Sequence, residues 1–157
     1  MIKVAPSLLS ANFACLKDDI EKIENGKADW LHYDVMDGHF VPNISFGYSI
    51  LKDVSKVTNL FLDVHLMISE PQKYVDEFIK SGANLIVFHI EAMENKEDTL
   101  ALIHHIKENN AHYLIEVDGG INATTGKQCK DAGVDVLVAG SYVFNSDDYT
   151  QRITSLK

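Results

Sequence analysis

Short, continuously apolar segments alternate with amphipathic segments along the whole chain, and this alternation constrains the fold more than any other feature. Apolar runs of about four to eight residues are typical of buried strands, whereas apolar residues three and four positions apart are typical of helices. Parallel strands joined by helices form α/β domains. The pattern therefore predicts one α/β domain over residues 1–157, with strands at 2–6, 30–35, 60–64, 85–88, 113–117 and 136–139.

Amphipathic segments between these strands are predicted to be helices. They lie around residues 16–23, 48–54, 71–79, 100–106, 122–132 and 147–156. The strand at 85–88 is continuously apolar and is expected to be buried on both faces. Cys15 and Cys129 fall at apolar positions of helices and form no spacing motif, which favours buried, unpaired thiols over a disulfide.

Polar residues lie at or just past the carboxyl end of every predicted strand. These residues are Ser7, Asp34, His65, His89, Asp118 and Ser141. An open doubly wound sheet concentrates its functional residues at one switch point, whereas a barrel collects them from nearly every strand. The distribution therefore favours a TIM-barrel type of fold. A Rossmann dinucleotide site is not indicated, since no G-x-G-x-x-G follows the first strand.

The charge of the chain narrows the range of partners. The formal net charge is −9 and no basic stripe is present, so nucleic acid and anionic membrane surfaces are disfavoured. A phosphorylated small substrate would have to be held by backbone amides and helix N-termini. The first residues lack a signal-peptide pattern, and no apolar run approaches the ~18 residues of a membrane span. We therefore expect a cytoplasmic protein.

His32 and Asp34 are two residues apart in an apolar, β-branched run, so both point to the same face of one strand. A histidine and a carboxylate on one strand face, directly before a loop rich in Gly, Pro and Asn, indicate a metal site or a proton-transfer site. Further histidine and carboxylate residues occur at 63–65 and 116–118. These segments are expected to supply the partners of His32 and Asp34.

Two other polar residues near this strand receive structural interpretations. Asp37 is expected to stabilise the turn at Gly38. His89 ends a strand that faces the site, and we expect it to pack in the core or behind the ligands rather than to bind a ligand itself.

Five segments resemble signatures of the ribulose-phosphate 3-epimerase family. They occur in the family's order and together span essentially the whole chain, at 5–13, 32–43, 63–67, 116–122 and 139–141. The resemblance implies a (β/α)₈ barrel and an isomerase of the pentose phosphate pathway. Such an enzyme acts on a small phosphorylated sugar and interconverts D-ribulose 5-phosphate and D-xylulose 5-phosphate by moving a proton at C3.

The resemblance also implies roles for particular residues. One divalent metal ion, Zn²⁺ by first expectation and otherwise Fe²⁺, Mn²⁺ or Co²⁺, would be bound by His32, Asp34, His65 and Asp118. Asp34 and Asp118 would also form the acid/base pair on opposite faces of an enediolate, whose negative charge the metal would stabilise. The substrate-binding residues would be Ser7, Met36, Met67, Gly119, Gly120, Gly140 and Ser141.

The chain departs from the family in its length. A complete barrel has eight β-α units and about 200 residues or more, whereas this chain has 157 residues and six predicted units. After residues 107–111 the sequence passes directly to 112–118, which resembles the family's seventh strand. We therefore expect two β-α units, with a glycine-rich phosphate loop, to be missing at the 111/112 junction. Six units could close into a smaller barrel, form an open sheet, or be completed by strand pairing between subunits.

Two other functions stay open from the sequence. A hexulose-phosphate 3-epimerase, such as one acting on allulose 6-phosphate, uses related chemistry, although residues 40–47 resemble the pentose enzyme more. A catalytically impaired barrel fragment could instead bind metal and serve as a folding or assembly module. Because apolar strand edges favour association, a homo-oligomer is expected.

Overall fold

The computed structural model describes residues 2–93, 116–117, 120–131 and 136–157. Two three-stranded sheets form the framework of these residues, and all neighbouring strands are parallel, as predicted. The first sheet has the order β2-β3-β4, with β2 at Trp30–Met36, β3 at Phe61–Met67 and β4 at Leu85–Phe88. The second has the order β1-β6-β5, with β1 at Lys3–Pro6, β6 at Val136–Ala139 and β5 at Glu116–Val117.

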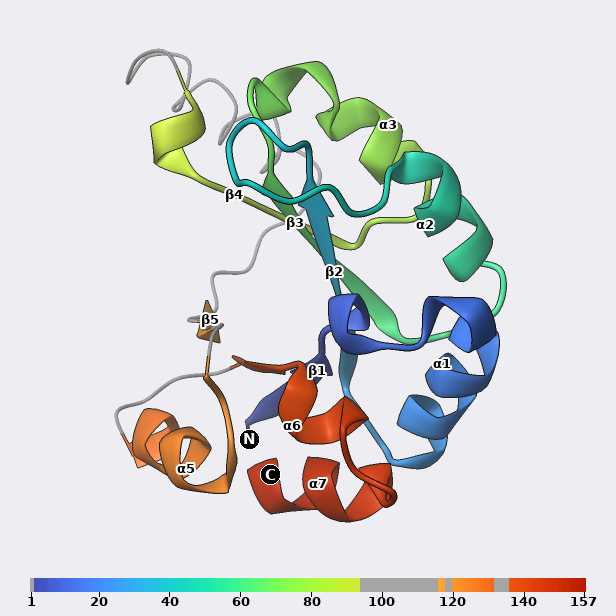
Figure 1. The fold of residues 1–157 in the computed structure, drawn as a ribbon, viewed down its shortest axis with the longest axis vertical. Coiled ribbons are helices and arrows are strands. Elements are labelled where there is room, and N and C mark those ends of the chain that lie inside the picture. Colours follow the sequence, from blue (N-terminus) through green and yellow to red (C-terminus); the bar gives the residue numbers. More distant parts are fainter. Residues whose placement is uncertain (1, 94–115, 118–119, 132–135) are drawn as a thin grey trace.

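The two sheets lie side by side and form one curved array. A parallel bridge between Ser7, directly after β1, and His32 in β2 connects them. The strand order is therefore β5-β6-β1-β2-β3-β4, with β4 and β5 at the two ends (Figure 1). Among the described residues β4 pairs with β3 alone and β5 with β6 alone, so they form an open arc of a barrel. The predicted truncated TIM-barrel type of fold is confirmed.

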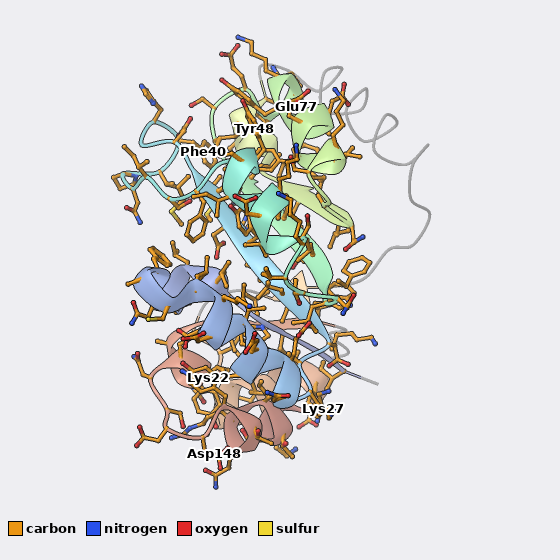
Figure 2. The ribbon with its side chains drawn as sticks, turned by 90° about the vertical axis from the view of Figure 1, so that its right-hand side faces the viewer. Lys22, Lys27, Phe40, Tyr48, Glu77 and Asp148 are labelled. Atoms are coloured by element: carbon orange, nitrogen blue, oxygen red, sulfur yellow. The ribbon has the colours of Figure 1, made fainter. Side chains whose placement is uncertain are left out.

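Helices lie along the outside of this arc (Figure 1). The α-helices are α1 (Leu16–Asn25), α2 (Tyr48–Val54), α3 (Val75–Lys80), α5 (Ala123–Asp131), α6 (Ser141–Phe144) and α7 (Tyr149–Leu156). Short 3₁₀ helices are η1 (Leu8–Ser10), η2 (Phe13–Cys15), η3 (Pro71–Lys73) and η4 (Ile90–Ala92). In Figure 2, α2 with Tyr48 and α3 with Glu77 lie together, and α1 with Lys22 lies below them. None of the described helices is long and apolar enough to cross a membrane.

Most predicted helices are present with shifted ends. The helix expected at 100–106 lies outside the described residues, as do the 111/112 junction and residues 113–115 of the fifth strand. The sequence did not predict α6, because its four residues are too few for a helical period to be visible.

Successive side chains of β2 point alternately toward the helices and toward the interior of the arc. Leu31, Tyr33 and Val35 are buried in the main hydrophobic core with residues of α1, α2 and α3. The Tyr33 hydroxyl donates a hydrogen bond of 3.0 Å to the backbone oxygen of Gly47, directly before α2. The residues between them, His32 and Asp34, consequently face the interior of the arc.

Three expectations about burial and strand ends are wrong. In β4 only Ile86 is buried, because within the described residues this strand has one neighbour instead of two. Cys15 is exposed, since it precedes the first turn of α1, and Cys129 is half-buried, although both thiols are unpaired as predicted. β3 continues to Met67 because it keeps pairing with β2, so His65 lies within the strand rather than after it.

Candidate active site

The register between β2 and β3 stacks the inward-facing side chains in layers. Because side chains alternate along a strand, every second pair of register partners faces the interior. From the amino to the carboxyl ends of the strands, these pairs are Trp30 with Phe61, His32 with Asp63, Asp34 with His65, and Met36 with Met67. The rings of Trp30 and Phe61 are stacked with centroids 4.5 Å apart. They form an apolar layer with Ala5, Val136 and Val138 toward the amino ends of the strands. The polar layers therefore lie toward the carboxyl ends, where TIM barrels carry their active sites.

His32, Asp34 and His65 form a cluster that fits a metal ion. His32 Nε2 lies 3.2 Å from Asp34 Oδ1, and His65 Nδ1 lies 3.5 Å from the same oxygen. The potential ligand atoms all lie within 4.8 Å of one another. His65 Nδ1 is buried and has no hydrogen-bond partner among the described residues. Two imidazole nitrogens and a carboxylate oxygen suit Zn²⁺ and other first-row divalent ions.

Hydrogen bonds within the cluster shift the ionisation of its members. Burial lowers the pKa of His32, but hydrogen bonds with Asp34 and Asp63 outweigh burial and raise the pKa to about 11. Burial raises the pKa of Asp34, yet hydrogen bonds from His32 and Ser7, together with the adjacent His65 ring, hold that pKa well below its usual range. At neutral pH the metal-free cluster thus contains an ionised Asp34 beside a protonated His32. A cation can replace the imidazole proton, since metal ligands bind in their deprotonated form.

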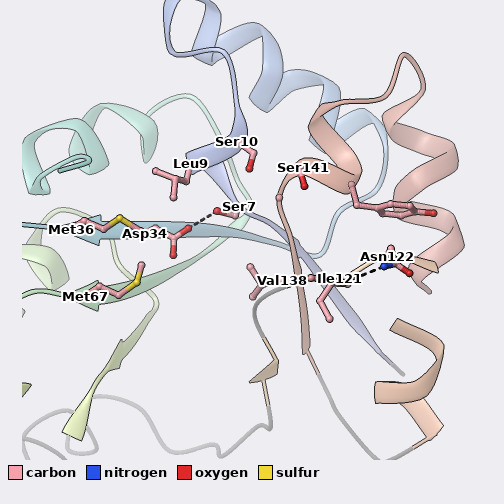
Figure 3. Close-up of a pocket in the computed structure, with 13 residues that line it drawn as sticks. Ser7, Leu9, Ser10, Asp34, Met36, Met67, Ile121, Asn122, Val138 and Ser141 are labelled. Carbon is pink, nitrogen blue, oxygen red and sulfur yellow. Dashed lines mark hydrogen bonds between the residues drawn. The ribbon is translucent and has the colours of Figure 1, made fainter. Parts of the chain in front are cut away.

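The two carboxylate oxygens of Asp34 have different neighbours. Oδ1 faces the histidines, whereas Oδ2 accepts a hydrogen bond of 2.5 Å from the Ser7 hydroxyl. Figure 3 shows Asp34 and Ser7 in the wall of a pocket, with Met36 and Met67 on one side of Asp34 and Ser141 on the other. Asp34 therefore connects the histidine cluster to the pocket.

The pocket has a volume of about 530 Å³, which is in the usual range for small-molecule sites. It brings together many of the predicted site residues, namely Ser7, Asp34, Met36, Met67, Gly120, Gly140 and Ser141. The lining residues that sequence reasoning missed are Leu9, Ser10, Ile121, Asn122, Val138 and Tyr142. All of them lie in, or directly beside, the segments 5–13, 116–122 and 139–141, so their position in these segments is the signal that could have found them.

Backbone groups and helix starts surround the part of the pocket farthest from the methionines. Asn122 accepts hydrogen bonds from two backbone amides at the start of α5. Gly120 has φ of 66°, in the left-handed region that favours glycine. Gly140 and Ser141 lie where α6 begins, and a Cβ on Gly140 would lie 2.5 Å from Ser10 Oγ. No Lys or Arg lines the pocket within the described residues, so the donors that an anion would meet there are uncharged: backbone amides and side chains such as those of Ser10, Asn122 and Ser141.

Two further residues extend the histidine cluster on the side away from Asp34. Asp63 is fully buried, and its Oδ2 lies 2.5 Å from His32 Nδ1. His89 is half-buried, and its Nε2 lies 2.8 Å from His65 Nε2, which agrees with the expectation that it packs behind a ligand. Sequence reasoning expected the segment 63–65 to supply partners of His32 and Asp34 but gave Asp63 no individual role, because its contact with a histidine of another strand depends on register.

Asp37 holds the loop that follows β2, as predicted. Its Oδ1 accepts hydrogen bonds of 2.9 Å from the backbone amides of His39 and Phe40 and so closes the turn at Gly38. Its Oδ2 accepts one of 2.8 Å from the Ser69 amide, after β3. One carboxylate therefore joins the loops after two neighbouring strands.

The predicted residues Asp118 and Gly119 lie outside the described residues. The roles of Asp118 as fourth metal ligand and second acid/base group, and of Gly119 as a phosphate contact, therefore stay predictions.

By sequence, the chain is similar to the ribulose-phosphate 3-epimerase family. The model of the ribulose-phosphate 3 epimerase family matches residues 3–107 and 104–144. Ribulose-phosphate 3-epimerase of Bacillus subtilis is 36% identical over 214 aligned positions, which cover 100% of this chain and 99% of that enzyme. The enzyme of Chlamydia muridarum is 34% identical over 209 positions, covering 96% and 92%. The first alignment is 57 positions longer than the 157-residue chain, which is therefore shorter than this relative.

Solved structures support the fold. Orotidine 5'-phosphate decarboxylase from Pyrococcus horikoshii has a TM-score of 0.64 at 10% identity, covering 98% of this chain and 96% of that one. A monomeric form of phosphoribosylanthranilate isomerase from Thermotoga maritima has a TM-score of 0.60 at 12% identity, covering 99% and 96%. At these identities the likeness concerns the fold alone.

Proposed function

Because the chain belongs to the ribulose-phosphate 3-epimerase family, we propose that it converts D-ribulose 5-phosphate to D-xylulose 5-phosphate by metal-assisted proton transfer at C3. The observation that carries this proposal is the position of Asp34. It contacts two histidines through one oxygen, and it lines a pocket of suitable size beside two methionines. A carboxylate placed in this way can hold a cation and still reach a substrate.

His32, Asp34 and His65 would bind one divalent metal ion, for which Zn²⁺ is our first choice, and Asp118 would be the fourth ligand. When bound, the metal supplies positive charge that stabilises the negative charge developing on the sugar oxygens at C2 and C3. The carboxylate and imidazole ligands stay in place without substrate because the strands of the arc position them.

Asp34 would take the C3 proton on its Oδ2, the oxygen that does not face the histidines. Ser7 holds that oxygen by its hydroxyl and so fixes the direction from which the proton is removed. Met36 and Met67 would exclude water from the planar enediolate with uncharged, polarizable surface. Asp118 would return a proton to the opposite face, which inverts the configuration at C3.

The phosphate would bind at the end of the pocket near α5 and α6. Gly120, Gly140 and Ser141 line this end, and Gly119 would complete it. Glycines allow a close approach of the backbone to an anion, and helix N-termini attract it. This arrangement suits a chain whose net charge is −9.

A second candidate is a metal-binding barrel fragment without efficient catalysis, which acts as a folding or assembly module. The shorter length of the chain relative to its relatives favours it. We propose that the absent residues belong at the 111/112 junction, supported by the two family matches that meet at residues 104–107. We also propose a homo-oligomer, because β4 and β5 end the arc among the described residues.

A steady-state assay with D-ribulose 5-phosphate separates these candidates. The chain would be freed of metal, loaded with Zn²⁺, Mn²⁺ or Fe²⁺, and compared with Asp34→Asn under the same loading. Turnover that disappears in Asp34→Asn supports the epimerase. Stoichiometric bound metal without turnover on the pentose phosphate or on a hexulose 6-phosphate rules the epimerase out and favours the fragment. Light scattering of the same samples measures the oligomeric state.

A further inference from the structure

The two histidines of the cluster meet Asp34 through different ring nitrogens. His32 turns Nε2 toward Asp34 Oδ1, at 3.2 Å, whereas His65 turns Nδ1 toward the same oxygen, at 3.5 Å. The other nitrogen of each ring faces a different residue, Asp63 for His32 and His89 for His65. A neutral imidazole carries its proton on one nitrogen alone, so these outer partners decide which nitrogen is left for a cation.

Asp63 favours a proton on Nδ1 of His32. It is the register partner of His32 across β2 and β3 and is fully buried. A carboxylate oxygen is an acceptor, so His32 Nδ1, which lies 2.5 Å from Asp63 Oδ2, is the ring nitrogen placed to donate. The other oxygen, Oδ1, is buried without a hydrogen-bond partner among the described residues. A buried carboxylate with one unsatisfied oxygen is costly for stability, which points to a role in orienting His32.

His89 favours a proton on Nε2 of His65. The two Nε2 atoms lie 2.8 Å apart, a distance that accommodates one shared proton. Glu91 Oε2 lies 3.8 Å from the other nitrogen of His89, Nδ1, and its negative charge favours a proton there. His89 Nε2 is then the acceptor, and His65 Nε2 must donate. Nδ1 of His65 consequently keeps its lone pair, which agrees with its burial without a hydrogen-bond partner among the described residues.

We propose that Asp63 and His89 are positioning residues that hold the two metal-binding histidines in opposite tautomers, so that His32 binds the cation through Nε2 and His65 through Nδ1. The inference rests on the metal site of the proposed function. Partners of this kind fix the orientation of a ligand imidazole and increase its affinity for metal. Here Asp63 lies in β3, and His89 directly follows β4.

Side-chain NMR of the ¹⁵N-labelled chain loaded with Zn²⁺ tests the tautomers directly. Long-range ¹H–¹⁵N spectra distinguish protonated from metal-bound ring nitrogens, and His32→Gln and His65→Gln variants assign the signals. We expect the proton on Nδ1 of His32 and on Nε2 of His65. Binding of Zn²⁺ through the opposite nitrogen of either ring overturns the inference while leaving the metal site intact. A chain that binds no Zn²⁺ refutes the metal site and the inference together.

Zn²⁺ affinity, measured by competition with a chelating indicator, tests the two partners separately. Asp63→Asn keeps the size of the side chain but removes its charge, and we expect about 10- to 100-fold weaker binding. His89→Leu should weaken binding by about tenfold, whereas His89→Gln, whose amide oxygen can accept from His65, should restore most of it. Asp53→Asn, on the exposed face of α2, is the matched control and should bind like the parent chain.

Two results would contradict the roles of Asp63 and His89. One is an Asp63→Asn variant with unchanged affinity, and the other is a His89→Gln variant that binds as weakly as His89→Leu. Circular dichroism verifies that each variant is folded. If Asp63→Asn does not fold, the NMR spectrum of the parent chain still tests the tautomer of His32, and the comparison of His89→Leu with His89→Gln still tests the role of His89. His89→Leu should also give His65 signals from both tautomers, which a purely structural role of His89 does not predict.

Discussion

Substitution of Gly140 by alanine tests how closely the pocket wall is packed. The new Cβ would lie 2.5 Å from Ser10 Oγ, well inside the contact distance of carbon and oxygen, but 3.5 Å from Ser10 Cβ, an ordinary contact. The clash is therefore confined to the hydroxyl. Overpacking of this kind costs about 1–3 kcal/mol, and we expect a loss of this size in the free energy of unfolding of Gly140→Ala.

Urea unfolding of a double-mutant cycle isolates the clash. Ser10→Ala alone should change the free energy of unfolding by less than about 0.5 kcal/mol, because Ser10 is half-buried at the surface of the pocket. In the double variant the hydroxyl is absent, so most of the loss caused by Gly140→Ala should be recovered, with a coupling energy of at least about 1 kcal/mol. Additive effects of the two substitutions would refute the packing argument.

Three further predictions concern other parts of the fold. Tyr33→Phe removes the hydrogen bond to Gly47 and should lower the free energy of unfolding by about 1 kcal/mol in urea titrations; no change would contradict the role of that bond. Burial raises the pKa of Asp37, but backbone amides of Ser69, His39 and Phe40 outweigh it and lower the pKa to about 2 from 3.8. The pKa of Asp37 is thus lower in the folded than in the unfolded chain. The parent chain should therefore be more stable than Asp37→Asn, fully so above about pH 4, and this advantage should disappear as the pH falls through about 2. An advantage that persists in acid unfolding experiments at lower pH would contradict this. Zn²⁺ at about 100 times its dissociation constant should stabilise the chain by about 2.7 kcal/mol, reversibly with a chelator and not in Asp34→Asn; equal stabilisation of the variant would contradict the ligand assignment.

The framework of the fold could be predicted because it depends on local patterns. Apolar runs identified β2, β4 and β6 almost to the residue, and apolar periodicity identified α1. The two-residue spacing of His32 and Asp34 correctly placed both on one face of the strand, and the structure shows that this face is the interior one. Short elements such as α6 and the continuation of β3 to Met67 could not be predicted, because neighbouring strands and not local sequence determine them.

The sequence could predict which residues belong to the site, but not the contacts between them. The polar strand ends and the resemblance together indicated the pocket residues, including Ser7 and Met67. The hydrogen bond between Ser7 and Asp34, and the contacts of Asp63 and His89, could not be predicted, since they depend on which strands are neighbours and on their register. Burial of β4 was overestimated for the same physical reason, because it assumed a strand neighbour on both sides.

The central claim is that Asp34, held by the histidine cluster and Ser7, transfers a proton at C3 of a ketopentose phosphate. The most direct measurement is NMR of D-ribulose 5-phosphate incubated with the Zn²⁺-loaded chain in D₂O. The account predicts deuterium at C3 together with the appearance of D-xylulose 5-phosphate, and neither in Asp34→Asn. Stoichiometrically bound Zn²⁺ without deuterium incorporation at C3, or incorporation that persists in Asp34→Asn, would contradict it.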